Sequence, residues 1–132
     1  MKYLFDTHAW IWWNAQPDAI SPAVKTLLAN PEQHEGLLLA AISVWEFSQL
    51  LEQGQLTLTC AAEDWIDQAL DMPGLKLAPL TPRIAFRATT LPGSPPADPI
   101  DQLIVATARE ENATIITKDP VIADYQHVRI LW

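Results

Sequence analysis

The feature of this sequence that most constrains its fold is the alternation of short runs without a polar face and amphipathic segments. Leu37-Leu38-Leu39-Ala40-Ala41 and Thr114-Ile115-Ile116-Thr117 have the length of strands and consist of apolar or β-branched residues. A strand with no polar face has to be covered on both sides. Helix-like segments separate these runs. The pattern therefore predicts an α/β fold in which helices cover both faces of a central parallel sheet.

The same patterns predict an order of elements. We expect strands at 3–5, 37–41, 75–77, 114–117 and 128–131, and helices at 8–14, 22–30, 43–54, 64–70, 82–87 and 99–111, with a short helix from 120. Ser21, Thr81 and Asp98 each precede a proline, which is typical of a helix start. The Pro-rich stretch 91–97 is predicted to be a long surface loop. No shift in composition divides the chain, so residues 1–132 are expected to form a single domain.

Composition excludes several classes of protein. Because 49% of the residues are hydrophobic, the chain is not a disordered acidic tail. The longest apolar run, Leu37 to Ile42, is far shorter than the ~20 residues of a membrane span, and residues 1–6 do not resemble a signal peptide. The single cysteine, Cys60, excludes an internal disulfide and is expected to be a buried thiol. We therefore expect a cytoplasmic protein with no membrane association. Its net charge of −8 argues against nucleic-acid binding through a broad basic surface.

Acidic residues occur where the predicted strands end. Right-handed crossovers bring these turns to one edge of a parallel sheet, where ligands of open α/β folds bind. The acids in question are Asp6, Glu46, Asp101 and Asp119. Carboxylates gathered there would repel one another unless a cation lay between them, and oxygen ligands suit Mg²⁺ or Mn²⁺. The chemistry indicated is metal-assisted phosphodiester hydrolysis.

Each acid except one also has a structural interpretation. Ser43 and Glu46 have the spacing of a capping box, and Asp101 suits the positive end of a helix dipole. Asp98 and Asp119 precede prolines, as N-caps do. Only Asp6, directly after the first strand, has no evident capping role.

Three arginines have two possible roles. Arg83, Arg87 and Arg109 fall at helical positions. They either contact phosphate or form an ordinary solvated helix face.

The sequence also resembles a known family, the PIN-domain ribonucleases, and among them the VapC-like toxins of type II toxin–antitoxin pairs. The segments that carry the resemblance are Leu4-Phe5-Asp6-Thr7-His8-Ala9, Ser43-Val44-Trp45-Glu46, Asp98-Pro99-Ile100-Asp101, Leu103-Ile104-Val105-Ala106-Thr107-Ala108, Ile116-Thr117-Lys118-Asp119-Pro120 and Ile130-Leu131-Trp132. These segments extend over nearly the whole chain, with the acids in the order of the family. The resemblance implies a PIN-like three-layer α/β/α sandwich that cleaves RNA at an acidic Mg²⁺ or Mn²⁺ site. It also implies a homodimer that a cognate antitoxin neutralises.

The resemblance assigns roles residue by residue. It implies that Asp6, Glu46, Asp101 and Asp119 are the catalytic and metal-binding acids. Asp98 would be an accessory acid or a helix cap, and the hydroxyls of Thr7 and Thr117 would orient carboxylates or waters. One position departs from the family, because Gln102 stands where an arginine usually follows the third acid. This substitution puts a phosphate or antitoxin contact at that position in question.

Two other interpretations compete with a nuclease. A receiver-like phosphoacceptor domain shares the length, the alternation of strands and helices, an acid after the first strand and a late lysine, Lys118. Such a domain usually has an acidic pair after its first strand, where this chain has Asp6 alone. The second alternative is a PIN-like domain that binds partners without catalysis.

Overall fold

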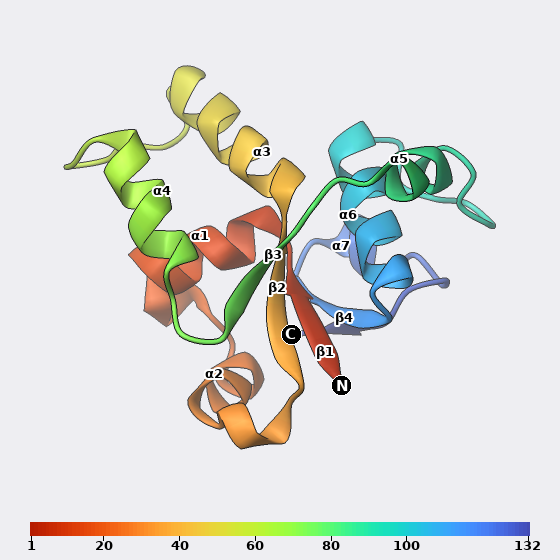
Figure 1. Cartoon of the computed structure of the whole chain (residues 1–132), viewed down its shortest axis with the longest axis horizontal. Helices are drawn as coiled ribbons and strands as arrows, with labels where there is room; N and C mark the ends of the chain where they lie inside the picture. The colour runs from red at the N-terminus through yellow and green to blue at the C-terminus, as the bar shows by residue number, and fades with distance from the viewer.

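The computed structural model describes all residues, 1–132, and its centre is a five-stranded parallel sheet (Figure 1). The strands lie in the order β3-β2-β1-β4-β5, and every neighbouring pair is parallel. They span Lys2–Phe5 (β1), Gly36–Ala40 (β2), Leu75–Ala78 (β3), Ala113–Ile116 (β4) and Ile130–Leu131 (β5). The predicted strands are confirmed to within one or two residues at each end.

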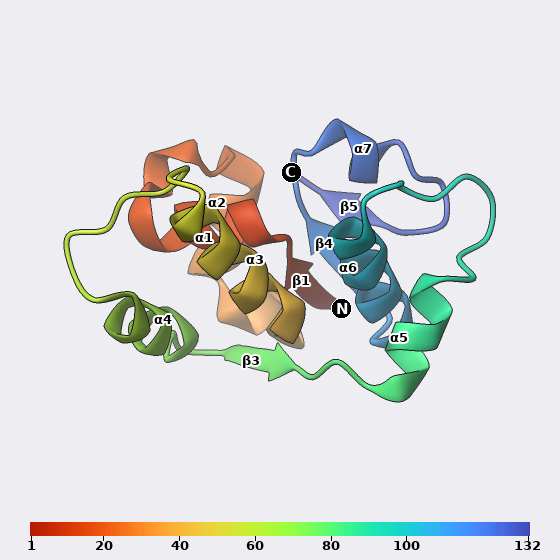
Figure 2. The same ribbon diagram turned by 90° about the horizontal axis from the view of Figure 1, so that it is seen from above.

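Helices cover both faces of the sheet, as predicted. One layer contains α1 (Thr7–Ala15), α2 (Pro22–Ala29), α3 (Ala41–Glu52) and α4 (Ala62–Leu70). The other contains α6 (Pro99–Glu110) and α7 (Pro120–Ala123), with α5 (Pro82–Ala88) packed against α6. Figures 1 and 2 show the two groups of helices on opposite sides of the strands. None of the helices is both long and apolar enough to span a membrane.

The strands are apolar throughout because successive side chains enter two different cores. Phe5, Leu39 and Ile116 pack with residues of α1 to α4. The preceding residue of β1, Leu4, packs on the opposite face, in the core that contains Ile104 of α6. This alternation across the sheet is the period of two that strand geometry imposes. It accounts for the absence of a polar strand face in the sequence.

The predicted helix starts at Ser21, Thr81, Asp98 and Asp119 are confirmed, and the one at Ser43 is wrong. The side chains of Ser21, Thr81 and Asp98 each accept a hydrogen bond from a backbone amide in the first turn of the following helix. In contrast, α3 begins at Ala41 and has no side-chain cap, so Ser43 lies inside the helix and is completely buried. The capping-box interpretation of Ser43 and Glu46 is therefore wrong, because the chain enters the helix directly from β2.

Two other expectations need correction. Cys60 is exposed, because it lies in the irregular segment between α3 and α4 and outside both cores. The strand order is also incompatible with a receiver-like domain, in which the order is 2-1-3-4-5. Here β1 lies between β2 and β4, and β3 is an edge strand.

Candidate active site

The four acids singled out in the sequence surround the carboxyl ends of the three central strands. Asp6 directly follows β1, and Asp119 follows β4 after two intervening residues. Glu46 lies on α3, which continues from β2, and Asp101 lies in the first turn of α6. We refer to these four residues together with Asp98 as the acidic edge.

Asp6 is the most deeply buried member of the acidic edge, with only 7% of its surface exposed. Its Oδ1 accepts a hydrogen bond from the amide of Ala9 at 2.7 Å, and its Oδ2 accepts one from the hydroxyl of Thr117. Asp6 is thus the N-cap of α1, a role that the sequence did not indicate. Burial raises the pKa of Asp6, the two hydrogen bonds and the charge of His8 oppose that rise, and the charge of Asp119 adds to it.

Thr117 connects two of the acids. Its hydroxyl donates to Asp6 and accepts a hydrogen bond from the backbone amide of Asp119 at 3.0 Å. The side chain of Asp119 in turn accepts from the amide of Val121 at 2.9 Å and caps α7. Because Thr117 is completely buried, these bonds fix the position of both carboxyl groups relative to β4.

Asp101 shows that the acids interact with one another. Burial and the repulsion of four neighbouring carboxylates raise its pKa from 3.8 to about 7. In decreasing order of effect, those carboxylates belong to Asp98, Asp119, Glu46 and Asp6. The fold therefore brings all five acids within electrostatic range, which no single spacing in the sequence could establish.

Glu46 and Asp98 differ in their surroundings. Asp98 is exposed, and its Oδ1 caps α6 by accepting from the amides of Ile100 and Asp101 at 2.7 and 3.2 Å. Glu46 is half-buried and has no hydrogen-bond partner within the chain. The carboxylate of Glu46 is therefore free to bind a ligand, whereas one oxygen of Asp98 is already engaged.

The remaining predicted hydroxyl, Thr7, does not contact a carboxylate. Its Oγ1 donates to Oγ of Ser43 at 2.9 Å, and both residues are buried. This bond ties the start of α1 to the first turn of α3, the helix that carries Glu46. The role of Ser43 was missed in the sequence. The available signal was a small polar residue within an otherwise apolar segment, but its partner lies 36 positions away.

Gln102, the departure from the family pattern, makes a contact of its own. Its Nε2 donates to the backbone carbonyl of Pro96 at 2.8 Å. The side chain thus anchors the Pro-rich loop to the start of α6.

The acidic edge fits a hard divalent cation by its donor chemistry. All its candidate ligands are carboxylate oxygens, and their mutual repulsion is the state that a bound cation relieves. No group of three Asp, Glu, His or Cys side chains is arranged so that it could hold a metal ion by itself. This arrangement suits Mg²⁺, which is usually held by one or two carboxylates and completes its shell with waters and substrate phosphates.

Comparison with known proteins places these residues in a family. Residues 3–128 match the PIN domain. The chain is 34% identical over 126 residues to ribonuclease VapC22 of Mycobacterium tuberculosis, an alignment that covers 96% of this chain and 93% of that protein.

Solved structures show the same fold. VapBC2 of Rickettsia felis, bound to a DNA fragment from its promoter, superposes with a TM-score of 0.71 at 15% identity, covering 99% of this chain and 98% of that one. The VapBC complex of Salmonella typhimurium bound to DNA gives a TM-score of 0.69 at 16% identity, covering 99% and 97%. At these identities, the likeness supports the three-layer fold and does not address the chemistry of the site.

Proposed function

The chain belongs to the PIN-domain family, in the branch that includes ribonuclease VapC22, and on this premise we propose that it is an endoribonuclease dependent on Mg²⁺ or Mn²⁺. The reaction would be hydrolysis of RNA phosphodiester bonds at the acidic edge. The single observation that carries the proposal is the repulsion at Asp101, whose pKa is raised to about 7 by burial and four neighbouring carboxylates. Groups with strongly perturbed pKa values cluster at functional sites, and a bound cation would neutralise this concentration of negative charge.

The ligands in this proposal are drawn from Asp6, Glu46, Asp101 and Asp119. A bound divalent ion would polarise a phosphoryl oxygen and lower the pKa of a bound water. The chain's own contribution is to hold the carboxylates in place. Thr117 orients Asp6 and the backbone of Asp119, and the Thr7–Ser43 bond sets the position of the helix that carries Glu46. Asp101 holds a proton near neutral pH until a cation favours its charged form.

We also propose that this activity is that of a toxin, active as a homodimer and neutralised by a cognate antitoxin. The support is that the structural neighbours include VapBC and other toxin–antitoxin complexes. An acidic edge without a balancing cation suits a basic segment of a partner protein. Expression without the antitoxin should arrest growth, and co-expression of a small protein encoded beside this gene should restore it.

The central experiment is an RNA cleavage assay with a panel of structured and single-stranded RNAs. We expect internal cleavage with Mg²⁺ or Mn²⁺, none in EDTA, and a loss of more than about a hundredfold in Asp101→Asn. The matched control is Asp64→Asn, which removes the same charge from an exposed position in the first turn of α4. Cleavage that persists both in EDTA and in Asp101→Asn would contradict the mechanism.

A binding module without catalysis is the remaining alternative. It would cleave no RNA of the panel under conditions where VapC22 cleaves its own. Divalent-cation binding in calorimetry that is strongly weakened in Asp101→Asn would count against it. The intact set of four acids favours the nuclease.

A further inference from the structure

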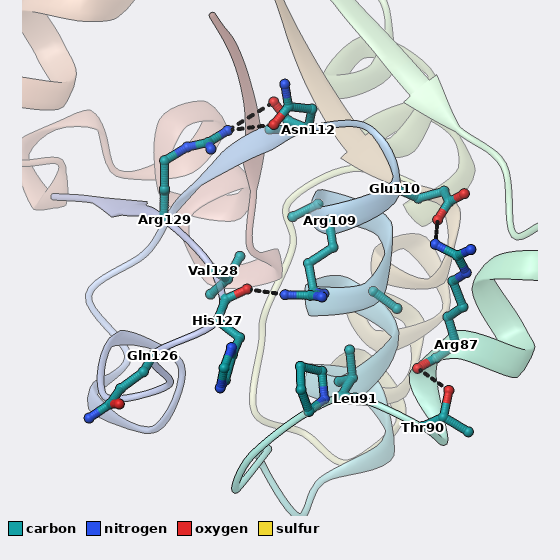
Figure 3. Close-up of a pocket in the computed structure, with 14 residues that line it drawn as sticks. Arg87, Thr90, Leu91, Arg109, Glu110, Asn112, Gln126, His127, Val128 and Arg129 are labelled. Carbon is teal, nitrogen blue, oxygen red and sulfur yellow. Dashed lines mark hydrogen bonds and ion pairs between the residues drawn. The ribbon is translucent and has the colours of Figure 1, made fainter.

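A cavity lies away from the acidic edge, at the other end of α6 (Figure 3). Its volume is about 620 Å³, within the range of roughly 300–1,000 Å³ typical of small-molecule sites. Its walls are the C-terminal part of α6, the segment that follows α5, and the segment 126–129 that leads into β5. Arg109 lies about 12 Å further along the axis of α6 than Asp101. The cavity is therefore distinct from the acidic edge.

Positive charge is concentrated in this cavity. The chain has four arginines, and Arg87, Arg109 and Arg129 line the cavity together with His127. In a chain with twice as many acidic as basic residues, this is an unusual local excess. Figure 3 shows that these arginines come from α5, α6 and the segment before β5, and that Arg87 is directed toward Glu110, Arg109 toward the carbonyl of His127 and Arg129 toward Asn112. We call this cavity the arginine cavity.

The three guanidinium groups are not equally available to a ligand. Arg87 is neutralised, because its Nη1 lies 3.0 Å from a carboxylate oxygen of Glu110. Arg109 and Arg129 have no carboxylate within 4.0 Å. They are therefore the two cations of the cavity without a counter-charge.

Both of these arginines are positioned by neutral groups of the chain. Arg109 donates one N–H to the backbone carbonyl of His127. Arg129 donates from Nη2 to the backbone and side-chain oxygens of Asn112, at 3.1 and 3.0 Å, and from Nε to Thr114. A guanidinium has five N–H donors, so each retains donors that face no protein acceptor. Two oriented guanidinium groups with spare donors are the usual means of binding an oxyanion through paired hydrogen bonds.

We propose that the arginine cavity binds the phosphate group of a nucleotide-sized ligand, with Arg109 and Arg129 as its donors. A phosphate supplies the charge and the several acceptor oxygens that these two side chains lack. The cavity has room for the attached nucleoside, and the exposed His127 imidazole on its wall offers a ring for a base to stack on. This site goes beyond the proposed nuclease activity and does not depend on it.

The test is binding in EDTA, because without a metal the acidic edge repels phosphate. Adenosine 5′-monophosphate, inorganic phosphate and adenosine are titrated into the full chain, followed by calorimetry and by backbone amide NMR. We expect the two phosphates to bind and adenosine alone to bind at least about tenfold more weakly. The shifted amides should be those of residues 109–113 and 126–129. Shifts confined to residues around Asp6 and Thr117, or no shift at millimolar phosphate, would overturn the proposal.

Three variants of equal charge change sharpen the test. Arg109→Gln and Arg129→Gln should each weaken phosphate binding by about tenfold. Arg83 does not line the cavity, although it pairs with Glu110 at its wall, so Arg83→Gln removes the same charge from α5 and should leave binding unchanged. Equal weakening in all three would contradict a specific site. If Arg109→Gln fails to fold, the NMR map of the unaltered chain and Arg129→Gln still decide the outcome.

A short single-stranded oligonucleotide, added in EDTA, distinguishes the source of the phosphate. Affinity more than about tenfold above that of the monophosphate, lost in Arg129→Gln, would identify a phosphate of an RNA strand as the ligand. Equal affinity would identify a free nucleotide. Both outcomes support the site, whereas oligonucleotide binding that neither arginine variant weakens would count against it.

Discussion

The two ends of α6 differ in the sign of the charge that lacks a partner. At the N-terminal end, Asp101 faces four carboxylates and no cation. At the C-terminal end, Arg109 and the nearby Arg129 have no carboxylate within 4.0 Å. The net charge of −8 is a sum over the whole chain, and it conceals two regions that are each locally unbalanced. It argues against a broad basic surface, but it does not exclude local binding of anions.

The two ends also differ in how their charges are held. Asp6 is almost completely buried and bonded to Thr117, so its position depends on the core of the domain. The arginines are exposed and bonded to backbone carbonyls of turns. We therefore expect substitutions at the acidic edge to change chemistry strongly, and substitutions at the arginine cavity to change affinity modestly.

The largest expected effect is that of removing an acid. Asp119→Asn keeps the cap of α7, because an amide oxygen can accept from the amide of Val121. It removes a charge from the acidic edge and should reduce metal-dependent RNA cleavage by more than about a hundredfold. Calorimetry with Mn²⁺ and the RNA assay measure the two effects, with Asp64→Asn as the control. Unchanged cleavage would separate Asp119 from the catalytic acids.

A smaller effect is expected from the hydroxyl that connects two acids. Thr117→Val removes the hydrogen bond to Asp6 and leaves the amide of Asp119 without its acceptor. We expect cleavage to fall by roughly 10–100-fold and the free energy of unfolding to fall by about 1–3 kcal/mol. Because that bond favours the charged form of Asp6, its loss should raise the pKa of Asp6 further.

The matched control for this hydroxyl is Thr107→Val. Thr107 is also buried, but its hydroxyl donates to the carbonyl of Leu103 within α6. Cleavage should be unchanged in this variant, and urea unfolding measures the stability of both. Equal losses of activity in the two variants would mean that Thr117 acts only through stability.

The third effect is a dependence of metal affinity on pH. The pKa of Asp101 is raised to about 7, so a cation has to displace a proton there at lower pH. Affinity for Mn²⁺ should be about tenfold weaker near pH 6 than near pH 8, and Asp101→Asn should remove most of this difference. An equally steep dependence in Asp101→Asn would assign the proton to another group.

The same raised pKa affects the stability of the metal-free chain. The folded state retains a proton on Asp101 that the unfolded state has already released above its ordinary pKa of 3.8. This contribution to stability is complete below pH 3.8 and is lost as the pH rises through about 7. Thermal unfolding in EDTA should therefore show a loss of stability across this interval that is smaller in Asp101→Asn.

The positions of Asp6 and Asp119 could be predicted from the sequence, because acids that come just after neighbouring parallel strands meet at one end of the sheet. Glu46 and Asp101 lie on helices, so their approach to this edge also depends on how α3 and α6 pack. The sequence did not predict the partner of Ser43 or the cap formed by Asp6, since both depend on side-chain contacts between elements. The arginine cavity could not be predicted from the sequence either. Arg129 joins Arg87 and Arg109 only through the turn before β5, and periodicity carries no information about that turn.

A more modest effect is expected from the loop beside the arginine cavity. Gly93 has a φ of +68°, and a Cβ there would lie 2.9 Å from Nε2 of His127. Gly93→Ala should lower the free energy of unfolding by about 1–2 kcal/mol through backbone strain, with an added cost from crowding. Gly54→Ala is the control, because its φ is +72° with nothing within 4 Å. The difference between the two variants in urea unfolding measures the crowding of His127, while metal binding should be unchanged in both.

The smallest expected effect is that of Arg83→Gln. This variant tests whether phosphate binds to oriented donors at the C-terminal end of α6 or responds only to the total positive charge nearby. Arg83 lies 3.3 Å from Glu110, which also pairs with Arg87, and 67% of its side chain is exposed. Surface pairs of this kind contribute about 0–1 kcal/mol, so Arg83→Gln should leave urea unfolding almost unchanged. Phosphate affinity should also stay the same. A loss of affinity equal to that in Arg109→Gln would mean that phosphate responds to the total charge near α5 and α6 rather than to oriented donors. In that case the salt dependence of binding would be the same in both variants. If the site is specific, only Arg109→Gln removes a phosphate contact, and only that variant should show a less steep salt dependence.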